Sequence, residues 1–284
     1  MTLPVIEPQT GDFTQPPSIN PALATEWLVA FLKDELIDGR GIERAVIGLS
    51  GGVDSAVTAF LCARALGPKN VFGIRMPYKH SSPGSLTDAH LVTEALGSNE
   101  STIDITAAAD GYLQLEPEAD GRRRGNVLAR TRMLVLFDQS AKRRALPVGT
   151  GNKTERLLGY FTWHADDSPP VNPLGDLYKS QVWKLAEYLG VPKPLIEKAP
   201  SADLEANQTD EGDLGITYAK ADAILARILE GYSNDQLVEH GFDRVEVEIV
   251  RGRLDGTHWK RHLPTTAMLS STAINEFYLR PVDF

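Results

Sequence analysis

Short apolar runs alternate with amphipathic segments over the first half of the chain. Four runs are candidates for buried strands, at residues 45–49, 71–76, 101–105 and 145–149. The segments between them carry apolar residues at helical spacing, at residues 56–66, 87–96 and 127–141. Strands that alternate with helices of about 10–15 residues are typical of parallel βαβ units. The pattern therefore predicts an α/β fold with a doubly wound, mostly parallel sheet.

A further helix is predicted before the first strand. Asn20 followed by Pro21 has the form of a helix N-cap with proline at the first helical position. Residues 1–20 contain four prolines and show little periodicity, which predicts an irregular N-terminal arm. Residues 21–284 are expected to form one domain, because no internal repeat or low-complexity segment divides them.

The C-terminal part is predicted to be a helical region. Helices are expected at residues 176–189, 217–230, 234–240 and 245–253. Asp176 is the expected cap of the first of these helices. Residues 198–215 are polar and acidic, and we expect them to be a mobile connector.

Composition limits the classes of function. The chain has 284 residues, with 29 Lys and Arg against 38 Asp and Glu, and a net charge of -9. This acidic balance disfavours a nucleic-acid or anionic-membrane partner, because binding phosphates requires a surplus of cations. The single cysteine, Cys62, excludes an intrachain disulfide and predicts a reducing compartment. With no signal peptide pattern and no long apolar run, the expected location is the cytoplasm.

The most informative stretch lies between the first predicted strand and its helix. It reads Gly48-Leu49-Ser50-Gly51-Gly52-Val53-Asp54-Ser55. Two adjacent glycines let the backbone approach a ligand, and the helix start adds N–H donors and positive potential. The order of residues matches neither GxxxxGK[ST] nor GxGxxG. The alternative is a glycine-rich turn that binds no ligand. Asp54 favours a phosphate site instead, because a carboxylate at such a site can bind an Mg²⁺ ion that also contacts the phosphates.

This loop resembles the pyrophosphate loop of the N-type ATP pyrophosphatases, whose shared chemistry is adenylation of a substrate by ATP. Four further segments are similar to the NAD synthetase family and occur in that family's order, at residues 125–133, 149–155, 175–182 and 200–211. They read GN…ARTRM, GTGNKTE, GDLYKSQV and PSADL…QTDE. The resemblance covers residues 20–265 and implies an adenine nucleotide α-hydrolase-like fold and a ligase that forms a C–N bond.

On the ATP side, the resemblance implies that residues 48–55 bind ATP together with Thr150, Lys179 and Ser201. It also implies that Asp54 and Glu155 hold Mg²⁺, and that Lys179 is catalytic because it balances charge as pyrophosphate departs. Judged without the family, Glu155 is an ordinary acid in a first helical turn and Lys179 a surface lysine.

On the acceptor side, the resemblance implies that four residues bind deamido-NAD, namely Arg130, Asp166, His258 and Lys260. Asp166 lies near the position where the amide forms and is therefore also expected to be catalytic. Without the family, Arg130 is an exposed helix charge.

Three positions depart from the family pattern. Trp163 stands where the family has a substrate-binding lysine, and Pro170 stands where it has a substrate-binding aspartate. Trp259 replaces a histidine, although His258 is adjacent. The two tryptophans are suited either to stacking on a nicotinate or adenine ring or to packing under a lid.

The activity implied is amidation of deamido-NAD to NAD. The nicotinate carboxylate attacks the α-phosphate of Mg-ATP, and ammonia then attacks the adenylate and releases AMP. Ammonia is the expected donor, because a glutamine-dependent form needs an extra amidase domain, larger than the ~100–200 residues of a typical domain. The family also implies a homodimer. The rivals are another adenylating enzyme with a different acceptor and a non-catalytic nucleotide sensor.

Overall fold

The computed structural model describes residues 12–79, 83–201, 209–262, 267 and 269. Its centre is a sheet of four strands, β1 (Ala45–Gly48), β2 (Val71–Arg75), β3 (Asn99–Thr102) and β4 (Leu146–Pro147). The strand order is β3-β2-β1-β4, and every pair is parallel. An isolated parallel bridge between Val148 and Val171 continues the sheet beyond β4.

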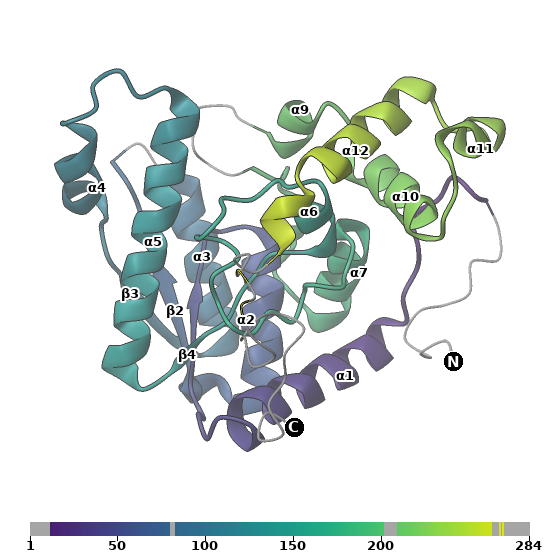
Figure 1. Ribbon diagram of the computed structural model, residues 1–284. Coiled ribbons are helices and arrows are strands. Elements are labelled where there is room, and N and C mark those ends of the chain that lie inside the picture. Colours follow the sequence, from purple (N-terminus) through teal and green to yellow (C-terminus); the bar gives the residue numbers. More distant parts are fainter. Residues whose placement is uncertain (1–11, 80–82, 202–208, 263–266, 268, 270–284) are drawn as a thin grey trace.

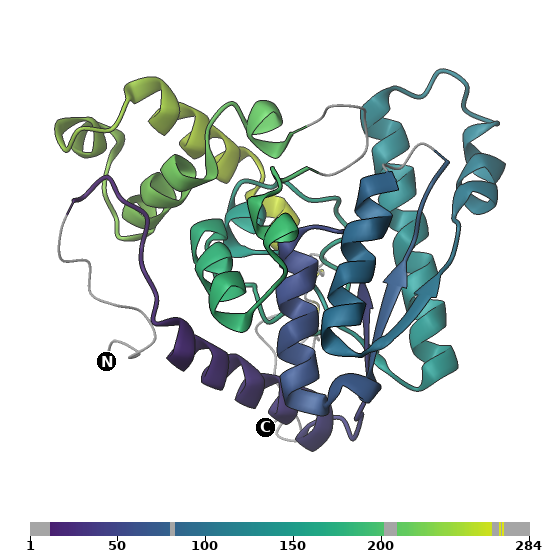
Figure 2. The same ribbon diagram turned by 180° about the vertical axis from the view of Figure 1, so that it is seen from behind.

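Helices cover both faces of this sheet (Figures 1 and 2). One face packs against α1 (Pro21–Lys33), α2 (Val53–Leu66), α3 (Pro83–Leu96) and α7 (Lys179–Leu189). The other packs against α4 (Thr106–Leu113) and α5 (Gly121–Arg143). Successive residues of β1 alternate between the two cores, since Ile47 faces α2 while Val46 faces α5. The predicted α/β fold with a parallel, doubly wound sheet is confirmed.

A second group of helices packs beside α7. It comprises α10 (Tyr218–Leu229), α11 (Asn234–Glu239) and α12 (Arg244–Gly256), which share a core of their own. The short helices are α6 (Lys153–Leu157), α8 (Lys193–Glu197) and α9 (Asp210–Leu214), with a π-helical turn at Asp34–Asp38 and 3₁₀ turns at Pro68–Asn70 and His258–Arg261. None of the helices in the described ranges is both long and apolar enough to cross a membrane.

Residues 12–20 run along this second group. The Phe13 ring stacks on His240 with 4.2 Å between ring centroids, and the Arg227 guanidinium lies 4.3 Å from the Phe13 ring. Gln181 Nε2 donates to the Pro17 carbonyl at 3.3 Å. The segment therefore links α10 and α7 through side-chain contacts that its proline-rich sequence did not indicate.

Several element boundaries differ from the predictions. The Asn20 cap is confirmed, since its Oδ1 accepts hydrogen bonds from Ala22 N and Leu23 N, each at 3.1 Å. Helix α5 begins six residues before the predicted start, because Asp120 caps it by accepting from Arg123 N at 2.7 Å. The first turn of α5 is rich in arginine and has no apolar periodicity, so the sequence pattern did not indicate where the helix begins. The acidic connector also contains a helix, α9, while residues 202–208 lie outside the described residues.

The prediction that Asp176 caps the next helix is wrong. Helix α7 begins at Lys179, and Tyr178 N donates to Gln181 Oε1 at 2.9 Å. Asp176 instead forms an exposed ion pair with Lys153 at 2.7 Å. A further acceptor at the start of α7 comes from another helix, which no local pattern reveals.

That acceptor is Asp222 of α10, which joins three helices. Its Oδ1 accepts from Thr154 Oγ1 of α6 at 2.5 Å, and its Oδ2 accepts from Ser180 N of α7 at 2.8 Å. Thr154 Oγ1 in turn accepts from Lys179 N at 3.0 Å. Asp222 is completely buried, so this one carboxylate sets the starts of α6 and α7 relative to each other.

We expect Asp222→Asn to change how stability depends on pH. Burial raises the pKa of Asp222 from 3.8 to about 6, so the wild type loses stability as the pH rises through this window and the carboxylate ionises. The loss is about 3 kcal/mol, and the variant lacks it. Urea unfolding between pH 4 and 7 should therefore show the stability difference, wild type minus variant, falling with pH. Asp138→Asn is a surface control, and a difference independent of pH would contradict the prediction.

Candidate active site

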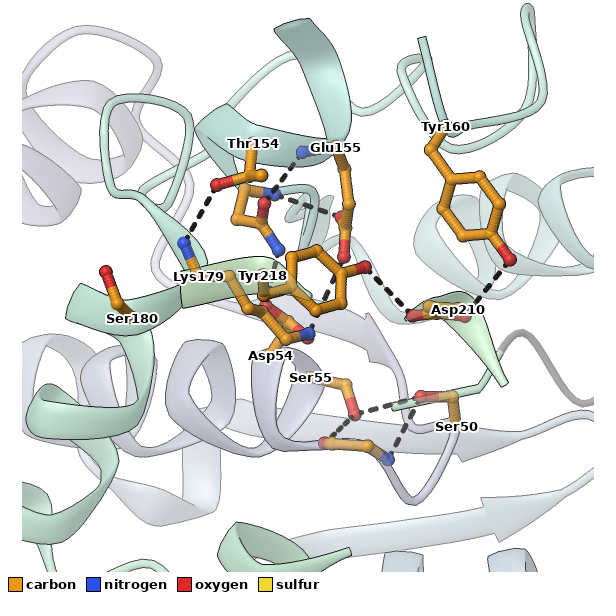
Figure 3. A network of polar contacts seen from close by, with 12 residues as sticks. Ser50, Asp54, Ser55, Thr154, Glu155, Tyr160, Lys179, Ser180, Asp210 and Tyr218 are labelled. Atoms are coloured by element: carbon orange, nitrogen blue, oxygen red, sulfur yellow. Dashed lines mark hydrogen bonds and ion pairs between the residues drawn. The ribbon is translucent and has the colours of Figure 1, made fainter. Parts of the chain in front are cut away.

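The glycine-rich loop forms a tight turn between β1 and α2. Gly51 has φ +79°, a backbone conformation that favours glycine. Ser50 Oγ accepts from Gly52 N at 3.2 Å, and Ser55 Oγ donates to the Gly52 carbonyl at 3.0 Å (Figure 3). Leu49 N donates to the Ile74 carbonyl of β2 at 2.9 Å, which anchors the loop to the sheet. The loop therefore occupies the carboxyl edge of the parallel strands, where α/β proteins bind ligands.

A buried ion pair lies next to this loop. Lys179, at the first position of α7, is 2% exposed, and its Nζ donates to Asp54 Oδ2 in the first turn of α2 (Figure 3). Asp54 Oδ1 accepts from Asn152 Nδ2 at 2.9 Å. The ammonium also lies 5.2 Å from the centroid of the Tyr218 ring. The pair and its two further partners, Asn152 and Tyr218, thus come from four separate segments of the chain. The interpretation of Lys179 as a surface lysine is wrong.

Glu155 completes this charged group. Its Oε1 lies 3.6 Å from Lys179 Nζ, and its Oε2 accepts from Asn152 N at 3.2 Å. Asn152 Oδ1 accepts from Glu155 N at 2.9 Å, so the two residues form a capping box at the start of α6. Burial and the Asp54 carboxylate raise the pKa of Glu155, while Lys179 acts in the opposite direction. Two carboxylates therefore compete for one ammonium.

This donor set suits a magnesium ion bound together with phosphates. Within the described ranges no group of three or more His, Cys, Asp or Glu side chains is arranged to hold a metal. Mg²⁺ usually needs only one or two carboxylates, because phosphates and water supply its other ligands. Asp54 and Glu155 meet that requirement, and the repulsion between them is a charge imbalance that a cation would relieve.

Asp210 extends the cluster to the segment that follows the undescribed residues. Its carboxylate accepts from Tyr218 Oη at 3.0 Å and from Tyr160 Oη at 3.2 Å (Figure 3). Asp210 N also donates to the Pro200 carbonyl at 3.0 Å, which brings the two ends of residues 200–210 together. Burial raises the pKa of Asp210, and Lys179 lowers it, so this carboxylate also belongs to the field around the ammonium.

Sequence reasoning missed several polar residues of this cluster, namely Asn152, Asp210, Tyr218 and Asp222. Asn152 and Asp210 lie inside the GTGNKTE and QTDE segments, so the segments themselves were the available signal. Tyr218 and Asp222 carry no motif, and only the packing of α10 against α6 and α7 brings them to the site.

The expected acceptor residues gather around one loop that follows α6. Arg130 of α5 donates to the Trp163 carbonyl through Nε and a terminal nitrogen, at 3.3 and 3.1 Å. Lys260 Nζ donates to the Gly159 carbonyl at 2.7 Å and also to the Phe161 carbonyl. Asp166 Oδ2 accepts from Thr162 N at 2.7 Å within the same loop. Residues 159–166 thus connect Arg130, Asp166 and Lys260.

Three other predicted site residues make none of the contacts described above for the loop at residues 159–166. His258 Nδ1 lies 2.8 Å from the Asp255 carbonyl at the end of α12, so its hydrogen bond is local and does not reach the loop. Thr150 is half-buried between β4 and α6. Ser201 is exposed and borders the undescribed residues 202–208.

Comparisons with known proteins identify the family of this chain. The sequence model of the NAD synthase family matches residues 24–264. The chain is 48% identical to the NH3-dependent NAD synthetase of Trichlorobacter lovleyi over 91% of this chain and 94% of that protein. The corresponding protein of Fusobacterium nucleatum is 46% identical over 85% of this chain and 94% of the relative.

Solved structures show the same similarity. The NH3-dependent NAD synthetase of Campylobacter jejuni has a TM-score of 0.76 and 31% identity, over 88% of this chain and all of that one. The NMN synthetase of Francisella tularensis has a TM-score of 0.78 and 32% identity, over 88% and 99%. The glutamine-dependent NAD synthetase of Acinetobacter baumannii is matched over 94% of this chain but 49% of that one, at TM-score 0.62 and 28% identity. The chain therefore belongs to the NAD synthase family.

Proposed function

We propose that the protein amidates deamido-NAD to NAD with ammonia and ATP, through an adenylated intermediate. The observation that carries this proposal is the buried Lys179 between the half-buried carboxylates of Asp54 and Glu155, beside the glycine-rich loop. A lone lysine held between carboxylates at a phosphate-binding edge is suited to stabilising charge that moves between phosphates. Family membership supplies the acceptor and the amidation step.

The reaction would proceed in two displacements. A carboxylate oxygen of the nicotinate attacks the α-phosphorus of ATP, and the bond to the departing pyrophosphate breaks. Ammonia then attacks the activated carbonyl carbon, loses a proton, and displaces AMP. The loop N–H groups and Lys179 would hold the polyphosphate, and Arg130, Asp166 and Lys260 would position the acceptor. Positioning and electrostatics suffice, with no covalent link to the enzyme.

Mg²⁺ is proposed as the metal of this site, held by Asp54 and Glu155. Bound with ATP, it would neutralise phosphate charge. The two carboxylates are supported as ligands by their shared position next to Lys179, and by the raised pKa of Glu155 beside Asp54.

Ammonia is the proposed nitrogen donor. A glutaminase needs a reactive cysteine, but Cys62 is fully buried inside α2, and burial raises the pKa of its thiol to about 12. The relatives from Trichlorobacter lovleyi and Fusobacterium nucleatum are both named NH3-dependent, and this chain covers 94% of each. A lone reduced cysteine supports the proposal that the protein works in the cytoplasm.

We expect Asp54→Asn to lower kcat more than about a hundredfold, because it removes a charge beside the reacting phosphates. The assay follows NAD and AMP together, with Mg-ATP, deamido-NAD and ammonium. Asp176→Asn is the matched control, since this carboxylate is 82% exposed and forms a surface ion pair with Lys153. A Lys179→Met change added to Asp54→Asn removes a buried ammonium that has lost its nearer carboxylate and keeps only Glu155 at 3.6 Å, so it should recover stability without recovering activity.

The same assay separates the rivals. Stoichiometric NAD and AMP would support the proposed reaction. Faster turnover of nicotinate mononucleotide than of deamido-NAD would indicate the shorter acceptor implied by the name of the Francisella tularensis protein. ATP binding with neither product would indicate a nucleotide sensor.

We also propose a homodimer, which the exposed apolar surface of α5 supports. Leu134 is 67% exposed and Phe137 is 42% exposed one turn later. A second copy would cover such a surface.

We expect Leu134→Glu to convert a dimer to a monomer, because it places a charge in the proposed contact. Sedimentation velocity measures the change. Leu229→Glu, at a 51% exposed leucine of α10, is the control that should stay dimeric. A wild type that is monomeric at micromolar concentration would contradict the proposal.

A further inference from the structure

Two tryptophans from distant segments meet at the loop that follows α6. The rings of Trp163 and Trp259 lie edge to face, with centroids 5.2 Å apart and an interplanar angle of 85°. Trp259 comes from the 3₁₀ turn His258–Arg261 and remains 52% exposed despite this contact. We call this pair the aromatic corner. It presents the Trp259 ring to solvent.

Two cationic side chains, Arg130 and Lys260, bind the loop that carries Trp163. Arg130 binds the Trp163 carbonyl, and Lys260, the neighbour of Trp259, binds the carbonyls of Gly159 and Phe161. Burial lowers the pKa of Lys260, whereas the Asp166 and Asp167 carboxylates act in the opposite direction. An aromatic face flanked by positive charge complements a ligand that joins an aromatic ring to phosphates.

The corner also lies close to the charged group around Lys179. The loop that carries Trp163 leaves α6 only a few residues after Glu155. Tyr160 of this loop donates to Asp210 at 3.2 Å, beside Lys179. Trp163 is three residues further along, so its Cα lies within about 11 Å of that of Tyr160. One short loop therefore carries both Trp163 and a residue that contacts the charged group.

We infer that Trp163 and Trp259 form a stacking subsite for an aromatic ring of the acceptor. The subsite replaces contacts that the resemblance assigns to a lysine and a histidine at these positions. Stacking selects a flat ring where a lysine selects charge, so this chain recognises its acceptor by a different interaction. The inference rests on the proposed function, because it takes deamido-NAD as the acceptor.

The test compares Trp259→Ala, Trp259→Phe and the matched control Trp27→Ala. Trp27 is 54% exposed on α1, a helix that packs against α2 and α7. Loss of one stacked ring should raise the KM for deamido-NAD roughly ten- to a hundredfold, while kcat and the KM for ATP stay near wild type. Trp259→Phe should recover most of the loss, and Trp27→Ala should change nothing.

Fluorescence titration supplies a readout that does not need turnover. Deamido-NAD should quench tryptophan emission of the wild type and of Trp27→Ala, and the quenching should be largely absent in Trp259→Ala. Nicotinate mononucleotide then identifies the ring: equal weakening of its binding by Trp259→Ala indicates the pyridine, and unchanged binding indicates the adenine. Both outcomes support the subsite.

An unchanged KM and unchanged quenching in Trp259→Ala would overturn the inference. So would a parallel loss of kcat and of affinity for ATP, which would show that the tryptophan only supports the fold. Failure of the proposed function is separate: a wild type that forms no NAD rejects the reaction, whereas the titration still decides whether the corner binds the dinucleotide.

Discussion

The buried contact between Lys179 and Asp54 is the interaction on which the site depends. An ammonium that is 2% exposed is costly unless opposite charge and hydrogen bonds surround it. Asp54, Glu155 and the face of Tyr218 supply that environment from α2, α6 and α10. Each of these helices must therefore lie within a few ångströms of its position for the lysine to stay charged.

The buried carboxylate of Asp222 maintains the relative positions of the helices around Lys179. Asp222 binds Thr154 and Ser180 N, and so joins the helix that carries Glu155 to the helix that begins with Lys179. Its raised pKa is the cost of placing a charge in the interior. Because Asp222 binds the starts of both α6 and α7, it couples the position of Glu155 to that of Lys179.

The acceptor side depends on weaker and more exposed contacts. Its loop is held by side chains that bind backbone carbonyls, through Arg130 and Lys260. Backbone contacts of this kind keep the loop shape when side chains along it change. These contacts therefore do not depend on which side chain stands at position 163, where the family resemblance led us to expect lysine.

The sequence by itself determined the parallel α/β order, the glycine-rich loop and the segments that contain Asp54, Glu155 and Lys179. These follow from local rules, because periodicity, glycine pairs and motif order are properties of neighbouring residues. The burial of Lys179, the joining role of Asp222 and the meeting of Trp163 with Trp259 were decided by the tertiary structure. In each case the partners are far apart in the chain, and only the packing of separate elements onto one edge of the sheet brings their side chains within contact distance.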